Sequence, residues 1–175
     1  LQEYAFITDE EKDQLLSWRR PVVLLQQKKN LAESINNGLG ELGVVFPYMP
    51  MHFLIFEEID LPALVCTSAN LSDEPIIADN KLAAKKLEHI ADAFLFHNRE
   101  IHNRTDDSVI RLLNFQPQII RRSRGYAPAP VILNFDVSGI LATGAELKNT
   151  FAIGMKQQAV LSQHIGDLKH YETHE

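Results

Sequence analysis

Short apolar runs separated by polar turns recur along the chain and predict a sheet. Val22 to Leu25 is an unbroken apolar run behind Pro21, and it has the length of a buried strand. Val44 to Phe46 is a similar run, which Pro47 ends because proline cannot continue a ladder of hydrogen bonds. The same pattern predicts further strands at 64–66, 93–96, 108–113 and 118–122.

Helical patterns lie between these strands. Thr8 and Glu11 have the spacing of a capping box, which predicts a helix over 8–18. Asp79 is placed to cap a second helix that reaches about residue 90, and shorter helices are expected at 31–35 and after residue 50. The residues expected to face inward from the second helix are Leu82, Leu87 and Ile90. Helices alternating with strands predict a mixed α/β fold.

A domain boundary is expected after these elements. Residues 127–130 read Ala-Pro-Ala-Pro, and each proline favours extended backbone before it. Short strands expected at 139–143, 150–153 and 159–161 would form a meander, and about 45 residues are too few to cover its apolar face. The predicted organisation is a first domain at 1–128, a linker at 129–138 and a truncated second domain at 139–175.

Composition and charge narrow the functional classes. The net charge is −6, from 17 basic and 23 acidic side chains, which argues against a general nucleic-acid binder. No apolar run approaches the roughly 20 residues that span a bilayer, so we expect a soluble, cytoplasmic protein without membrane association. Cys66 is the single cysteine, which excludes an internal disulfide and predicts a small core residue on its strand.

Three polar segments are candidates for an anion site. Thr67, Ser68 and Asn70 follow a predicted strand, and their hydroxyl and amide groups can hold phosphate oxygens or a planar carbamoyl group. The alternative for these residues is an ordinary polar turn. The other two segments are 104–108 and 121–126, within a stretch (99–124) that carries six of the eight arginines and a net charge of +3. Arginine binds phosphate bidentately, although charged strand edges explain the same pattern.

Two other motifs are set aside. Residues 38–43 match the glycine pattern of dinucleotide-binding loops, but they lie between a helix and a strand instead of between a strand and a helix. His170 and His174 have the spacing of a zinc pair, but no third ligand is evident nearby. We therefore expect no metal site built from these residues.

The ordered motifs resemble a known family. Residues 67–76 (TSANLSDEPI) resemble the TSxNxSxEPI motif in the YrdC/Sua5-like domain of HypF-type carbamoyltransferases. Residues 46–52 (FPYMPMH) are similar to the family's LPYTPLH, with Met49 in place of the usual threonine. The resemblance continues in order through 97–101, 106–109, 121–128, 144–151 and 162–168.

The resemblance implies a fold and an activity. The fold would be a YrdC-like twisted mixed sheet with helices, followed by the opening strands of a Kae1-like domain of the actin/Hsp70 ATPase type. The enzymes of this family make carbamoyl-adenylate from carbamoyl phosphate and ATP with Mg²⁺. They pass the carbamoyl group to the C-terminal cysteine of HypE, for the cyanide ligand of NiFe-hydrogenase.

The resemblance also implies roles for particular residues. Ser68 and Asn70, beside Thr67, would contact the nucleotide or the carbamoyl group. Ser108 falls where related domains place a serine near phosphate, and Arg121 or Arg122 falls where they carry an arginine. No catalytic residue is assigned by the resemblance.

The family's other segments have no counterpart in this chain, which is therefore expected to be an internal fragment of a larger enzyme and inactive alone. Zinc is expected only in the family's cysteine-rich segments, which are absent here. Two alternatives remain open. One is a threonylcarbamoyl-adenylate synthase of tRNA modification, which has no need of the segments after residue 127. The other is a non-catalytic RNA-binding module that uses residues 121–124, although binding of double-stranded RNA is not expected.

Overall fold

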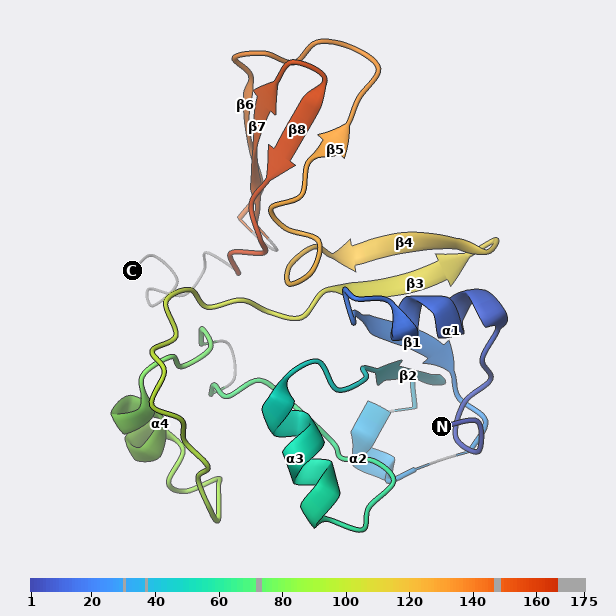
Figure 1. Cartoon of the computed structure of the whole chain (residues 1–175), viewed down its shortest axis with the longest axis vertical. Helices are drawn as coiled ribbons and strands as arrows, with labels where there is room; N and C mark the ends of the chain where they lie inside the picture. The colour runs from blue at the N-terminus through green and yellow to red at the C-terminus, as the bar shows by residue number, and fades with distance from the viewer. Residues whose placement is uncertain (30, 37, 72–73, 147–148, 167–175) are drawn as a thin grey trace. The chain divides into compact units, whose positions relative to one another are not determined.

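The computed structural model is a mixed α/β structure with two compact units, and it describes residues 1–29, 31–36, 38–71, 74–146 and 149–166 (Figure 1). The first unit comprises Leu1–Cys66 and Asp107–Tyr126. The second comprises Thr67–Asp106 and Ala127–Glu175. The fold class expected from the sequence is confirmed. The predicted domain boundaries at 128 and 139 stay a prediction.

The first unit is built on a four-stranded mixed sheet with the strand order β2-β1-β3-β4. Its strands are β1 (Val22–Gln26), β2 (Glu41–Val44), β3 (Val109–Leu113) and β4 (Gln116–Arg121). β1 pairs parallel to β3, with Val22 opposite Val109, and the other two pairings are antiparallel. The parallel pair brings the start of β3 beside the start of β1, although more than 80 residues separate them in sequence.

The helices begin where the polar caps predict. In α1 (Asp9–Leu16) the Glu11 amide donates to the Thr8 hydroxyl over 3.2 Å, and the Thr8 amide donates to the Glu11 carboxylate over 2.8 Å. In α4 (Asn80–Lys86), which belongs to the second unit, the Leu82 amide donates to the Asp79 carboxylate over 2.7 Å. The remaining helices are α2 (Glu33–Asn36) and α3 (Pro50–Glu58). No helix in the described ranges is long and apolar enough to cross a bilayer.

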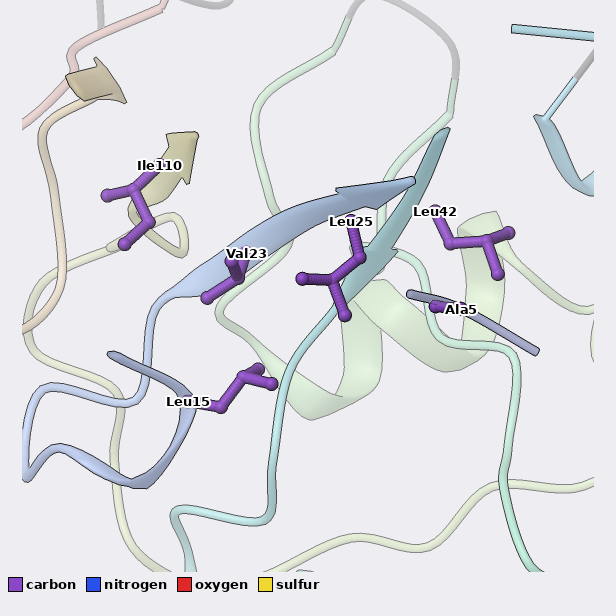
Figure 2. Close-up of a cluster of buried hydrophobic side chains, with 6 residues drawn as sticks. All are labelled: Ala5, Leu15, Val23, Leu25, Leu42 and Ile110. Carbon is purple, nitrogen blue, oxygen red and sulfur yellow. The ribbon is translucent and has the colours of Figure 1, made fainter. Parts of the chain in front are cut away.

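The core of the first unit lies between α1 and one face of the sheet (Figure 2). Val23 and Leu25 alternate with partly exposed neighbours on β1, as a strand with one buried face requires. Leu15 from α1 packs against them, and burial of such a side chain contributes about 1.5–3 kcal/mol. The other members of this buried cluster are Ala5, Leu42 and Ile110.

The second unit contains an antiparallel sheet with the order β5-β8-β7-β6. The strands are β5 (Val131–Ile132), β6 (Leu141–Thr143), β7 (Phe151–Met155) and β8 (Gln158–Leu161). The predicted meander is present, and β5 adds a strand that the sequence pattern did not predict. Apolar side chains on these strands are exposed, which agrees with the expectation that the meander does not cover itself.

Several predicted elements differ from the structure. Residues 64–66 and 93–96 lie outside strands, and Cys66 is exposed instead of buried. An apolar run becomes a strand only when another strand pairs with it, and none does so in the described part of the chain. β2 begins and ends earlier than predicted, so residues 45 and 46 lie beyond it. α4 ends at Lys86 instead of near residue 90. Leu82 and Ile90, which were expected to face inward, are exposed. An apolar pattern predicts which side chains of a helix share a face, but it does not specify which segment covers that face.

Candidate anion-binding site

The turn after β4 packs closely against the link between α1 and β1. Gly125, in this turn, has a φ of +82°, which favours glycine. A Cβ at this position would lie 2.8 Å from the carbonyl oxygen of Arg19. The glycine therefore permits a close approach of two backbone segments that carry Arg19 and Arg122.

Four contacts of the Arg124 guanidinium hold these two backbone segments together. Its guanidinium donates to the carboxylate of Asp107 over 2.7 Å and to the carbonyl oxygens of Arg19 and Arg20 over 3.1 and 2.7 Å. It also lies over the ring of Tyr48, 3.4 Å from the ring centroid. Charge-assisted hydrogen bonds of this kind are about twice as strong as neutral ones. Arg124 thus acts as a positioning residue for the turn.

Residues 46–52 (FPYMPMH) contact the same guanidinium through the ring of Tyr48. The Tyr48 and His52 rings meet edge to face with their centroids 4.7 Å apart. The Tyr48 amide donates to Nδ1 of His52 over 3.4 Å. Burial and the nearby carboxylate of Asp107 raise the pKa of the Tyr48 phenol above its usual value.

Ser108, predicted to contact phosphate, lies fully buried directly before β3. Its hydroxyl donates to the carbonyl oxygen of Arg124 over 2.9 Å and accepts from the amide of Ser123 over 2.8 Å. Both bonds hold the turn after β4 in place. Contact of Ser108 with phosphate stays a prediction.

Two further arginine side chains donate to carbonyl oxygens of this turn. Nε of Arg19 donates to the carbonyl oxygen of Gly125 over 3.1 Å, and Nη2 of Arg122 donates to that of Tyr126 over 3.0 Å. The Arg19 guanidinium also lies 4.8 Å from the ring of Trp18 and 5.0 Å from the ring of Tyr126. Burial, and then the positive charge of Arg19, lower the pKa of Arg122 below its usual value. The two positively charged side chains therefore bind the carbonyl oxygens of adjacent residues in this turn.

The sequence predicted only part of this group. Arg122 was predicted, and so was Arg121, which is the exposed last residue of β4. Arg19 and Trp18 were missed because they lie far from the arginine-rich stretch in sequence. The pairing of β1 with β3 was the signal that could have found them, because it places the residues before β1 beside those around β3.

The predicted turn of the second unit offers a different chemistry. Thr67 and Ser68 are exposed there. The side-chain amide of Asn70 donates to the carbonyl oxygens of Leu71 and Glu74 over 2.9 and 3.0 Å, which identifies its nitrogen and its oxygen. Oδ1 of Asn70 is buried without a hydrogen-bond partner in the described part of the chain. This oxygen can accept a hydrogen bond from an N–H or O–H group of a ligand.

Ser108, Arg121 and Arg122 thus belong to the first unit, and Thr67, Ser68 and Asn70 belong to the second. Their convergence on one ligand stays a prediction. No group of three or more His, Cys, Asp or Glu side chains that could hold a metal occurs in the ranges that the structure describes. His170 and His174 lie outside those ranges.

Two family matches cover most of the chain. Residues 1–123 match the Sua5/YciO/YrdC family, whose description is telomere recombination. Residues 136–175 match the HypF Kae1-like domain.

Curated relatives are similar to nearly the whole chain. A probable carbamoyltransferase HypF of Methanocaldococcus jannaschii is 44% identical over 97% of this chain and 22% of its own length. The carbamoyltransferase HypF of Rhizobium leguminosarum bv. viciae is 41% identical over 98% of this chain and 24% of its own length. The chain therefore spans under a quarter of the length of these relatives.

Two solved structures have the same fold over this length. One is full-length HypF in its phosphate- and nucleotide-bound form, with a TM-score of 0.90 and 45% identity over 99% of this chain and 28% of that chain. The other is HypF of T. kodakarensis, with a TM-score of 0.90 and 40% identity over 98% of this chain and 23% of that chain.

Proposed function

Since the chain belongs to the Sua5/YciO/YrdC family, we propose that it forms the nucleotide-binding part of a carbamoyltransferase of the HypF type. The observation that carries the proposal is the order of the two matches in one chain, with the Kae1-like match directly after the first. Relatives named carbamoyltransferase that are similar across both parts support it.

The first proposed step forms an acyl-adenylate. Water hydrolyses carbamoyl phosphate to carbamate and inorganic phosphate, a carbamate oxygen then bonds to the α-phosphorus of ATP, and pyrophosphate leaves. The positive charge of Arg122 and the hydroxyl groups of Thr67 and Ser68 would stabilise the phosphate oxygens. Oδ1 of Asn70 would accept from the NH₂ of the carbamoyl group or from a ribose hydroxyl, because its own NH₂ is used within the loop.

Mg²⁺ would accompany the nucleotide. Mg²⁺ prefers oxygen ligands and is commonly held by substrate phosphates with one or two carboxylates. Asp107 is paired with Arg124, and no carboxylate cluster occurs in the described ranges, so the phosphates would supply most of the ligands.

The second proposed step is transfer to a thiol. The C-terminal cysteine sulfur of a HypE-type partner bonds to the carbamoyl carbon, AMP leaves with the bridging oxygen, and the thiol proton passes to solvent. The thiocarbamate would then serve cytoplasmic hydrogenase maturation. Binding of a nucleotide and of phosphate by a full-length HypF supports the choice of ligands.

A threonylcarbamoyl-adenylate synthase is less well supported. Such an enzyme needs the YrdC-like part, but it does not need the residues that match the Kae1-like domain. The RNA-binding alternative gains no support from relatives named carbamoyltransferase.

Exchange of labelled pyrophosphate into ATP tests the proposal, with the protein at its natural length. We expect exchange that depends on carbamoyl phosphate, and negligible exchange by the 175-residue chain alone. Ser68→Ala should lower the rate about tenfold or more, because it removes a hydrogen bond to a charged group. Thr143→Ala, which removes an exposed hydroxyl from β6, is the matched control. Exchange that requires threonine and bicarbonate instead would overturn the proposal.

A further inference from the structure

Glu74 lies at the centre of the hydrogen bonds that hold the side chain of Asn70. The Glu74 amide donates to the carbonyl oxygen of Leu71 over 3.0 Å. The Glu74 carbonyl oxygen accepts from the side-chain NH₂ of Asn70 over 3.0 Å, and the same NH₂ donates to the carbonyl oxygen of Leu71 over 2.9 Å. Both carbonyls that bind the Asn70 amide therefore depend on the position of Glu74.

The Glu74 carboxylate is bound by a lysine from outside this loop. Nζ of Lys86 lies 2.7 Å from Oε2 of Glu74. The two side chains are only 33% and 24% exposed, so water screens this ion pair less than a pair on the open surface. Lys86 is the last residue of α4, where the helix dipole favours a positive charge. The ion pair thus ties the loop to a helix.

The orientation of the Asn70 amide decides which ligand groups it can bind. An amide side chain has a donor end and an acceptor end, and rotation about its last bond exchanges them. Here two carbonyl oxygens bind the NH₂ end, and Oδ1 is buried without a partner in the described part of the chain. A buried acceptor without a partner is unfavourable, so the amide keeps this orientation only while both carbonyls stay in place.

We propose that Lys86 is a positioning residue for Asn70. Through the Glu74 carboxylate, Lys86 holds the carbonyls that keep Oδ1 of Asn70 as an acceptor for an N–H or O–H group of the ligand. The identity of that ligand, a carbamoyl group or the ribose of a nucleotide, rests on the proposed function. Lys86 acts on the ligand only through Asn70, because its ammonium group is bound to the carboxylate.

Pyrophosphate exchange by the natural-length protein measures the effect of the ion pair on catalysis. Lys86→Met removes the charge but keeps an unbranched apolar side chain, and it should lower kcat/KM about tenfold or more. Lys86→Arg keeps the charge and should retain most of the activity. A raised KM for carbamoyl phosphate would identify its NH₂ as the donor to Oδ1 of Asn70, and a raised KM for ATP would identify a ribose hydroxyl. An unchanged kcat/KM for both substrates would overturn the proposal.

A double-mutant cycle separates positioning of Asn70 from a general structural role. Asn70→Ala should itself lower kcat/KM about tenfold, because it removes the acceptor. In the Asn70→Ala background no amide remains to be oriented, so Lys86→Met should lower kcat/KM by less than about twofold. A lysine that only stabilises the fold would cost the same factor in both backgrounds, and that result would overturn the proposal.

Lys85→Met is the matched control. Lys85 precedes Lys86 in the same last turn of α4, but it is exposed and has no ion pair in the described part of the chain. Hydrogen exchange followed by mass spectrometry reads the loop without any activity. The amides of Glu74 and Ile77 are hydrogen-bonded within the loop and should exchange about tenfold faster in Lys86→Met, but at the wild-type rate in Lys85→Met. Equal effects of the two lysine variants would overturn the proposal.

The positioning role and the proposed function fail in different ways. If Lys86→Met matches the wild type in pyrophosphate exchange and in hydrogen exchange of the loop, while the wild type requires carbamoyl phosphate, the role of Lys86 is wrong and the function stands. If Lys86→Met speeds hydrogen exchange of the loop but the wild type shows no pyrophosphate exchange, the hold of Lys86 on the loop stands and the function is wrong.

Discussion

At the residue scale, Gly125 and Arg124 hold the same turn by different means. Gly125 contributes by lacking a side chain, since a Cβ would contact the backbone of Arg19. Arg124 contributes by its guanidinium, which joins the residues before β1 to Asp107 before β3. Neither function follows from composition, because both depend on which segments the sheet brings together.

Gly125→Ala should lower the free energy of unfolding by about 2–4 kcal/mol, because it adds a steric clash to the cost of a left-handed backbone. Gly40→Ala is the matched control: its φ is +71°, but open space surrounds its position. It should cost only about 1–2 kcal/mol. Urea unfolding measures both values, and equal losses would show that the approach to Arg19 is not tight.

Ser108 and Ser123 are both fully buried but differ in their hydrogen bonds. Ser108→Ala removes two hydrogen bonds and should destabilise the chain by about 1–3 kcal/mol. Ser123→Ala should be neutral or slightly stabilising, because the Ser123 hydroxyl has no partner in the described part of the chain. Equal losses measured by urea unfolding of the two variants would contradict these assignments.

The Tyr48 phenol predicts a loss of stability at alkaline pH. Its pKa is raised in the folded chain, so the unfolded chain releases this proton first, near pH 10. Stability should therefore fall as the pH rises from about 10 through the raised pKa. Tyr48→Phe should reduce that fall, which urea unfolding at pH 9 and pH 11 measures. An unchanged fall would show that the phenol is not buried beside Asp107.

At the element scale, the caps were predicted better than the strands. Thr8 and Asp79 are local signals, because a cap bonds to amides two or three residues ahead, and both caps are present. The expected strands at 64–66 and 93–96 failed because pairing depends on distant segments. The predictions of β1 and β3 are confirmed, because each is an apolar run with β-branched residues and the two strands pair with each other.

The α1 cap is open to a direct test. Thr8→Ala should lower the free energy of unfolding by about 1 kcal/mol, because it removes the acceptor for the Glu11 amide. Glu10→Ala removes an acidic group from the same first turn but no capping bond, and it should cost only a few tenths of a kcal/mol. Thermal unfolding followed by circular dichroism compares the two variants.

At the scale of the whole molecule, the sequence motifs named the candidate residues but not their surroundings. The positive charge of residues 99–124 predicted Arg122 as a candidate. Arg19 became a candidate only from the structure, in which β1 pairs with β3 and Arg19 bonds to Gly125. Asn70 was predicted as an amide ligand, and only the loop geometry shows that its oxygen is the available atom. Which atom faces a ligand depends on hydrogen bonds that a motif does not specify.

The central claim is that Ser68 contacts a phosphate of a bound nucleotide. The most direct measurement is a crystal structure of the natural-length protein with AMP. The account predicts a phosphate oxygen within about 3 Å of the Ser68 hydroxyl. A bound AMP whose phosphate lies far from Ser68 would contradict it.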